Sequence, residues 1–206
     1  KKVLEEMAEI AVEKDVYVFS DEAYERLVYG KKHISIGSLN GMEDYVATFH
    51  TFSKSYAMAG FRVGYVSGPK QLIDAIIKSK HYMSIAPPNL SQLLALKALT
   101  ISNSYITNMV KEYNNRRLYI VKRLNSLGLK TATPYGAFYA FSNVKHLTSN
   151  TLEFARKLLR EAKVAVVPGT DFGKYGEGYL RFSYATKMPL IKEALDRIEG
   201  FLKQNI

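Results

Sequence analysis

The sequence predicts an α/β fold followed by a smaller α+β unit, and two patterns carry that prediction. In the first hundred residues, short runs of β-branched and aromatic residues alternate with amphipathic helical patterns, which is typical of layered α/β structure. Beyond about residue 100 the order changes to one long amphipathic helix, then strand, helix, two strands and a last helix. We therefore expect two domains, 1–100 and 101–206, joined by the long helix.

The first unit is expected to alternate helices with three buried strands. It opens on a helical pattern that places Val3, Met7 and Ile10 on one face and the charges on the other. Each predicted strand is a short apolar run, and the helix that follows the third strand has Pro69 near its start. The strands are predicted at 16–20, 45–51 and 62–68, and the later helices at 68–83 and 86–100.

The second unit is organised around a long helix predicted from about residue 102 to residue 127. Its apolar side chains form one stripe, and Gly128 stands where a C-terminal cap belongs. A glycine-rich stretch near residues 169–178 is predicted to be a loop. The remaining strands are predicted at 136–144, 164–169 and 178–185, and the remaining helices at 151–163 and 188–204.

Composition narrows the functional classes. The 206 residues include no cysteine, which excludes disulfides and thiolate nucleophiles and suits a reducing cytoplasm. No apolar run reaches the ~18 residues of a membrane span, so no membrane partner is expected. The net charge of +10 comes from basic residues spread along the chain, so we expect no nucleic acid partner. The four histidines lack metal-ligand spacing, and no metal is expected.

Four positions combine reactive side chains with places where ligands gather. Asp21 and Lys54 follow predicted strands, and the carboxyl ends of strands face the ligand in open α/β sheets. Arg62 stands between glycines, and Arg181 lies in a strand pattern between apolar neighbours. Each has an ordinary alternative, because most lysines and arginines are solvated, a strand-terminal aspartate is usually a cap, and a tyrosine such as Tyr24 usually packs.

Taken together and in order, these residues resemble the class I/II (aspartate aminotransferase-like) pyridoxal-phosphate-dependent aminotransferases of fold type I. The lysine signature of that family ends in Gly-x-Arg-x-Gly and reads TFSKSYAMAGFRVG here, with Thr51 where Ser or Gly is more usual. The other landmarks are VFSDEAYERLVY upstream and TPYGAFYAF, VAVVPGTDFG and GYLRFSYA downstream. The resemblance implies the C-terminal half of such an enzyme, a partial α/β/α large domain plus the α+β small domain.

The resemblance implies that Lys54 forms an imine with the cofactor pyridoxal 5'-phosphate. Only a primary amine condenses with an aldehyde in this way, which is why a lysine is required. Asp21 would hold the protonated ring nitrogen, since a carboxylate stabilises the neighbouring positive charge. Tyr24 would place its phenol on the 3-oxygen of the cofactor.

Arginine and hydroxyl side chains are implied for the anionic groups. Arg62 would bind the phosphate, because a guanidinium pairs with it bidentately. Thr51 and Ser53 would donate hydroxyl protons to the same phosphate, although either residue suits a cap of the following helix. Gly60 and Gly64 would let the backbone bend or approach closely. Arg181 would bind the substrate α-carboxylate.

The implied reaction is transamination between an L-amino acid, of the aspartate or aromatic type, and a 2-oxo acid. The freed amine of Lys54 would move the proton between the substrate and the cofactor. The resemblance also implies a cytoplasmic homodimer about twice this length, so we expect a fragment with little or no activity of its own. A pyridoxal-phosphate-dependent C–S lyase or other fold type I enzyme, the effector domain of a transcription regulator, and a non-catalytic fragment stay open as alternatives.

Overall fold

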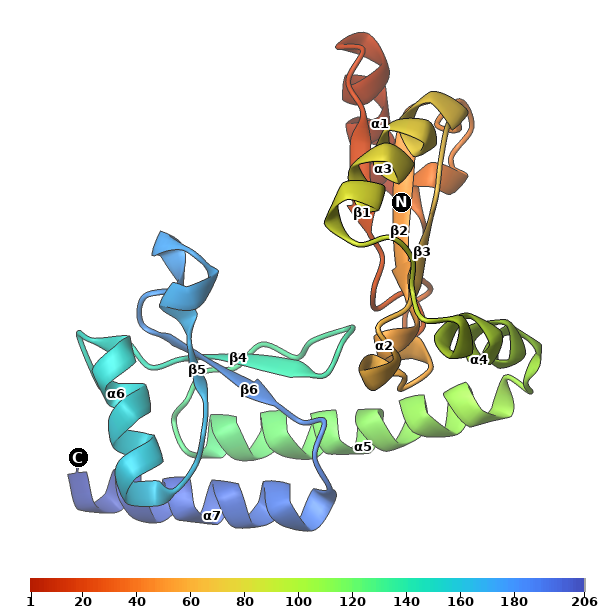
Figure 1. Cartoon of the computed structure of the whole chain (residues 1–206). Helices are drawn as coiled ribbons and strands as arrows, with labels where there is room; N and C mark the ends of the chain where they lie inside the picture. Colours follow the sequence, from red (N-terminus) through yellow and green to blue (C-terminus); the bar gives the residue numbers. More distant parts are fainter. Residues whose placement is uncertain (206) are drawn as a thin grey trace. The chain divides into compact units, whose positions relative to one another are not determined.

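The computed structural model describes residues 1–205, and the chain divides into two compact units. Unit 1 is Lys1–Thr107, and unit 2 begins at Asn108 (Figure 1). The division lies inside the long helix α5 (Ser104–Ser126), whereas the sequence pattern changes near residue 100. Among residues 1–205, no helix is both long and apolar enough to cross a membrane.

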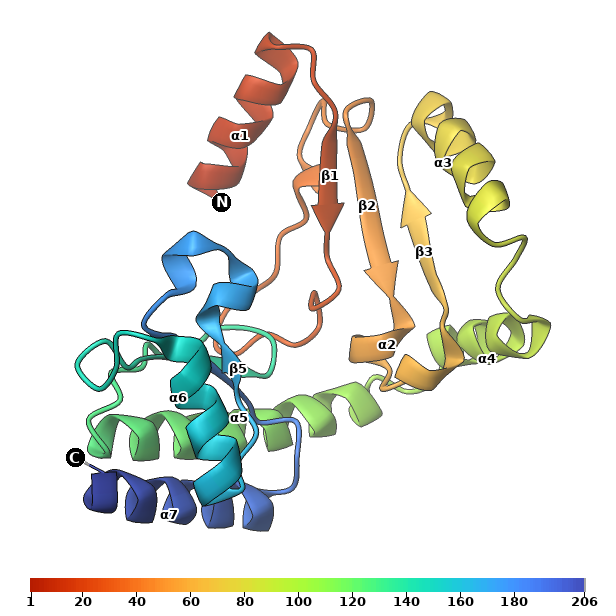
Figure 2. The same cartoon turned by 60° about the vertical axis from the view of Figure 1, so that its left-hand side comes forward.

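Unit 1 contains a three-stranded sheet whose geometry brings three chain segments to one edge. The strands β1 (Val18–Asp21), β2 (Val46–Thr51) and β3 (Gly64–Ser67) lie in that order, with β2 in the centre (Figure 2). Because β1 and β2 are parallel, their carboxyl ends share an edge. Because β3 is antiparallel to β2, β3 begins at that same edge.

The two faces of this sheet differ in what covers them. Side chains alternate along a strand, so Val18 and Val46 share one face and Phe19 belongs to the other. Helix α1 (Lys2–Glu13) and the turn η1 (Ile36–Ser38) cover the first face. On the second face the ring of Phe19 stacks on that of Phe49, with 5.8 Å between the ring centroids, and Phe19 remains 59% exposed. The buried cluster on the first face consists of Ala11, Ile36, Met42 and Val46.

Three further helices and one turn complete unit 1. The short helix α2 (Phe52–Ser55) follows β2 directly, and the turn η2 (Ala59–Phe61) precedes β3. Helix α3 (Lys70–Met83) buries none of its side chains. Helix α4 (Asn89–Thr100) packs its small residues against the α2 region. The residues that form this contact are Phe52, Val63, Ala95 and Ala98.

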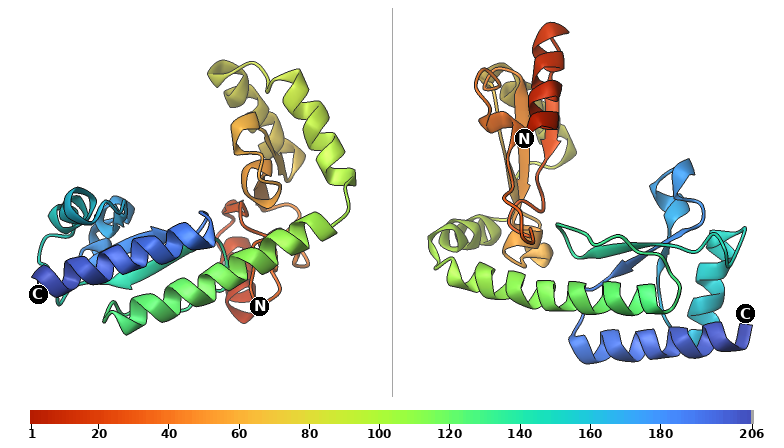
Figure 3. Two further views of the ribbon diagram at one scale, coloured as in Figure 1. Left: turned by 90° about the horizontal axis from the view of Figure 1, so that it is seen from below. Right: turned by 180° about the vertical axis from the view of Figure 1, so that it is seen from behind.

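Unit 2 is an α+β unit whose sheet has the order β4-β6-β5, with antiparallel pairs throughout. Helix α7 lies alongside the C-terminal half of α5 (Figure 3), and Arg123 of α5 bonds both Asp196 and Glu199 of α7. Apolar side chains of both helices and of β4 and β6 form one core. The elements are β4 (Tyr139–Asn143), α6 (Thr151–Lys157), β5 (Val167–Pro168), β6 (Tyr179–Ser183) and α7 (Met188–Asn205).

Unit 2 departs most from the sequence prediction between residues 164 and 178. The strand predicted at 164–169 is only Val167–Pro168, because residues 164–166 lie outside the pairing with β6 and the chain turns directly after Pro168. The glycine-rich stretch is not a simple loop, since it forms the turns η4 (Gly169–Phe172) and η5 (Lys174–Gly176). Helix α6 also continues as a π-helical turn over Leu158–Ala162.

Gly128 follows α5 with φ +80°, as a C-terminal glycine cap requires.

Candidate active site

The sequence-predicted residues of unit 1 gather at one edge of its sheet. Asp21 ends β1, Thr51 ends β2, and Arg62 lies two residues before β3. In the strand register Asp21 lies opposite Phe49, which is two residues before Thr51. Since side chains two residues apart share a face, Asp21 and Thr51 project from the same side of the sheet.

Thr51 fixes the start of the helix that carries Lys54. Its backbone is extended, and its Oγ1 accepts a hydrogen bond of 3.1 Å from the N–H of Ser53. The capping interaction left open for Thr51 is therefore present, and the hydroxyl proton is still available to a second acceptor. Lys54 is half-buried, and its Nζ lies 5.9 Å from the centroid of the Tyr24 ring. This contact brings together two predicted site residues that are 30 positions apart in the sequence.

The segment between Lys54 and β3 holds two residues in a strained backbone conformation. Ala57 has φ 55° and Arg62 has φ 52°, both in the left-handed region. Such conformations cost about 1–3 kcal/mol at a non-glycine residue and concentrate at functional sites. Arg62 is exposed, and its Nη1 donates to the carbonyl oxygen of Ala59 at 2.9 Å. The fold therefore holds this guanidinium in place at the edge of the sheet.

The two glycines that flank Arg62 are not equivalent. A Cβ on Gly64 would lie 2.5 Å from the carbonyl oxygen of His50, so the pairing of β3 with β2 requires glycine there. A Cβ on Gly60 would meet nothing within 4 Å. Of the bend or close approach expected at these glycines, a close approach is present at Gly64 and not at Gly60.

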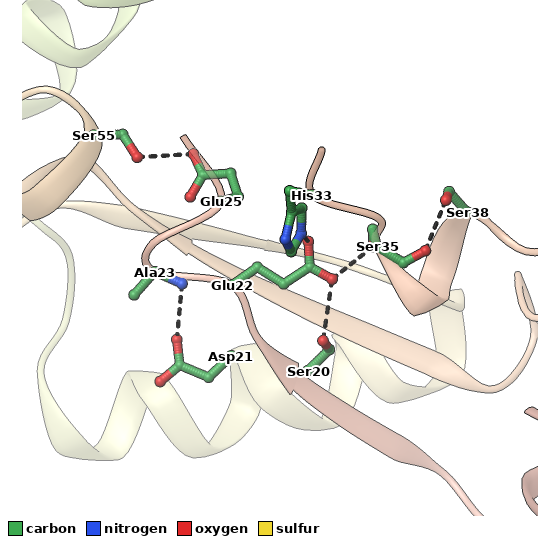
Figure 4. A network of polar contacts seen from close by, with 9 residues as sticks. All are labelled: Ser20, Asp21, Glu22, Ala23, Glu25, His33, Ser35, Ser38 and Ser55. Carbon is green, nitrogen blue, oxygen red and sulfur yellow. Dashed lines mark hydrogen bonds and ion pairs between the residues drawn. The ribbon is translucent and has the colours of Figure 1, made fainter. Parts of the chain in front are cut away.

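Figure 4 shows Asp21 and a neighbouring carboxylate that the sequence analysis did not identify. Asp21 is exposed, and its Oδ1 accepts from the N–H of Ala23 at 3.1 Å. Glu22 points the other way and is only 5% exposed. Its carboxylate accepts hydrogen bonds from three side chains, at 3.1 Å from Ser20, 2.6 Å from Ser35 and 2.7 Å from Nε2 of His33.

The environment of Glu22 favours its ionised form. Burial alone raises the pKa of Glu22, but the hydrogen bonds from Ser35, His33 and Ser20 outweigh it and leave the pKa below that of an ordinary glutamate. Because the pKa is lower in the folded chain, ionised Glu22 stabilises unit 1 fully above the unfolded pKa of ~4.3. That stabilisation is lost as the pH falls through the pKa that Glu22 has in the folded chain.

We therefore expect Glu22→Gln to destabilise unit 1 by about 1–3 kcal/mol at pH 7, because an amide group would meet donors that need a carboxylate. The difference from the wild type shrinks below about pH 4. Urea denaturation at pH 7, 4 and 3 measures the difference in the free energy of unfolding between the variant and the wild type. Glu43→Gln, at an exposed glutamate of the same unit, is the control. An equal difference at all three pH values would contradict this account.

Arg181 belongs to unit 2, and its guanidinium lies close to two aromatic rings. Arg181 is half-buried on the central strand β6, so it is not one of the solvated arginines of a protein surface. Its guanidinium carbon is 4.3 Å from the ring centroid of Tyr139 and 4.4 Å from that of Phe172. Aromatic rings attract a guanidinium but accept no full hydrogen bond from it, so its N–H groups keep the capacity to bind a carboxylate.

Comparison with known proteins shows which family this chain belongs to. The family model described as aminotransferase class I and II matches residues 1–198. The chain belongs to the class I and II aminotransferases. Among the members of this family, it is 46% identical to an aspartate aminotransferase of Pyrococcus abyssi and 44% identical to aromatic-amino-acid aminotransferase 2 of Thermococcus litoralis. Both alignments cover 99% of this chain and 53% of the relative, so the chain spans about half the length of these aminotransferases.

Solved aminotransferase structures show the same fold. The aromatic aminotransferase of Pyrococcus horikoshii matches with a TM-score of 0.94 at 44% identity, over 99% of this chain and 56% of that one. An aspartate aminotransferase mutant of Thermus thermophilus, complexed with tryptophan, matches with a TM-score of 0.91 at 36% identity, over 97% of this chain and 52% of that one. The expected fold, an α/β fragment of a fold type I enzyme, is confirmed.

Proposed function

We propose that this chain carries the cofactor-binding lysine and the substrate-binding arginine of a pyridoxal-phosphate-dependent aminotransferase. The observation that carries the proposal is the position of Lys54, with its amine near the Tyr24 ring, next to the sheet edge where Asp21, Thr51 and Arg62 meet. Family membership supports the same activity.

The residues present suit pyridoxal phosphate in both charge and chemistry. A guanidinium and two hydroxyl groups, from Arg62, Thr51 and Ser53, match a phosphate dianion. Asp21 is exposed at the end of β1, on the same face of the sheet as the exposed Phe19. That face offers one carboxylate for a protonated ring nitrogen. Pyridoxal phosphate, when bound, supplies an aldehyde for the lysine and a ring that accepts electrons.

The side chains of this chain then have distinct tasks. Lys54 would hold the cofactor through its amine and, once freed, would carry the proton from the substrate Cα to the cofactor. Tyr24 donates its phenol proton toward the 3-oxygen and so tunes the basicity near Lys54. Asp21 would keep the ring nitrogen protonated, and Arg181 would bind the substrate α-carboxylate through its N–H groups.

The substrates proposed are an L-amino acid of the aspartate or aromatic type and a 2-oxo acid. The names of the relatives support both types, since one is an aspartate aminotransferase and another an aromatic-amino-acid aminotransferase. We also propose a homodimer in the cytoplasm for the whole enzyme, as the family resemblance implies.

Reductive trapping tests the assignment of Lys54. The 206-residue chain is incubated with pyridoxal phosphate, reduced with borohydride and digested, and the label on each lysine is quantified by mass spectrometry. We expect Lys54 to be labelled about tenfold more than the exposed Lys78, because a phosphate bound at Arg62 concentrates the aldehyde beside Lys54. Lys54→Arg should remove that label and leave the labelling of Lys78 unchanged.

Equal labelling of Lys54 and Lys78 would refute the assignment. The reaction itself is tested by oxo-acid formation from an amino acid and 2-oxoglutarate, after addition of the remaining half of a relative's chain. Release of pyruvate and ammonia from cysteine in place of transamination would identify a lyase.

A further inference from the structure

One hydrogen bond joins the two segments that carry Tyr24 and Lys54. Ser55 follows Lys54 and is fully buried, and its hydroxyl donates to Oε1 of Glu25 at 2.9 Å (Figure 4). Glu25 in turn follows Tyr24 in the sequence. Each partner of this bond is thus the immediate neighbour of a proposed site residue.

The bond matters because the helix that carries Lys54 cannot position itself. Helix α2 has only four residues, and a helix this short has almost no stability of its own. Its direction depends on what holds its two ends. At the first end Thr51 caps the helix, and at the last end Ser55 bonds Glu25.

The hydrogen bond of Ser55 links two distant parts of the chain. A serine in a helix often bonds a carbonyl of its own helix, whereas Ser55 donates to a residue 30 positions away. The other oxygen of Glu25, Oε2, is buried and has no hydrogen-bond partner among residues 1–205. Ser55 is therefore the side-chain donor that the structure shows for this carboxylate, and its loss would leave the carboxylate without one.

We propose that Glu25 and Ser55 are positioning residues that hold the Lys54 amine against the Tyr24 ring. This inference rests on the function proposed above, and neither residue is assigned to the cofactor or the substrate. The bond couples Tyr24, at the end of one segment, to Lys54, in the short helix. Without it, the buried side chain of Phe52 still anchors the start of helix α2, but the end that carries Lys54 loses its hydrogen bond to the Tyr24 segment, and the amine spends less time at the ring.

Reductive trapping of Lys54 with pyridoxal phosphate, measured relative to Lys78, tests the pair. Loss of one hydrogen bond is worth about 1 kcal/mol, so Ser55→Ala and Glu25→Ala should each lower the labelling rate of Lys54 about fivefold. Glu25→Gln keeps an oxygen acceptor and should restore most of the rate. The double variant Ser55→Ala/Glu25→Ala should be no slower than either single one, because both remove the same bond.

The matched control is Ser38→Ala, which removes an exposed serine of the same unit that bonds a backbone carbonyl. It should label Lys54 at the wild-type rate. Thermal melts show which variants fold, and if Ser55→Ala does not, Glu25→Ala against Glu25→Gln gives the comparison. Wild-type labelling in folded Ser55→Ala and Glu25→Ala would overturn the inference and leave the proposed function standing. Wild-type Lys54 labelled no faster than Lys78 would remove both.

Discussion

Arg62→Asn is expected to weaken the binding of pyridoxal phosphate about 10- to 100-fold, because a charge-assisted hydrogen bond contributes about 1.5–3 kcal/mol. Asparagine suits this position, since Arg62 has φ 52° and ψ 47° and asparagine tolerates the left-handed region better than most residues. The substitution therefore removes the guanidinium and keeps the backbone. Isothermal titration of the chain with pyridoxal phosphate measures the change in affinity.

Pyridoxal without the phosphate is the decisive control ligand. Its binding should be equal in the wild type and in Arg62→Asn, because the proposed partner of Arg62 is missing from it. Arg62→Lys should lose less affinity than Arg62→Asn, since an ammonium keeps the charge but not the bidentate geometry. An equal loss of affinity for both ligands would show that Arg62 supports the local fold and does not bind phosphate.

Leu195→Ala is expected to lower the free energy of unfolding of unit 2 by about 2–5 kcal/mol. Leu195 is 1% exposed on helix α7, in the core shared with α5 and the sheet. Truncation there removes apolar contacts and leaves a cavity that the packed helices cannot fill. Urea denaturation followed by circular dichroism measures the loss, and hydrogen exchange of α5 and α7 peptides assigns it to unit 2.

Leu190→Ala is the matched control for that measurement. Leu190 lies on the same helix, but it is 52% exposed, so its truncation should change stability by less than about 0.5 kcal/mol. Faster hydrogen exchange in β1 and β2 of Leu195→Ala would contradict the prediction, because these strands belong to unit 1.

The order of the elements could be predicted from the sequence, because each strand and helix has its own hydrophobic period. Strand β2 and helix α5 were predicted nearly to their ends for this reason. Strand β5 was predicted too long, since an apolar run does not show where neighbouring strands stop pairing. The sequence predicts only a loop at 169–176, because glycine permits many values of φ and so does not indicate which turn forms.

The sequence predicts the reactive residues that we propose for the site, but it does not predict the residues that hold them. Lys54 and Arg62 belong to a contiguous motif, whereas the partners of Glu22 and Glu25 lie 2 to 30 positions away and depend on the fold. One signal was available. Alternation along β1 places Glu22 on the same face as Val18, and a buried acid there requires hydrogen-bond donors.

The contact between the two glycines of the η4–η5 turns limits how this protein can be engineered. A Cβ on Gly169 would collide with the carbonyl oxygen of Gly176, and a Cβ on Gly176 would collide with that of Gly169. Any side chain at either glycine would force the turns apart and move Phe172 off the guanidinium that it covers. A library of variants in these turns can therefore include Tyr175, which is 85% exposed, but has to keep both glycines.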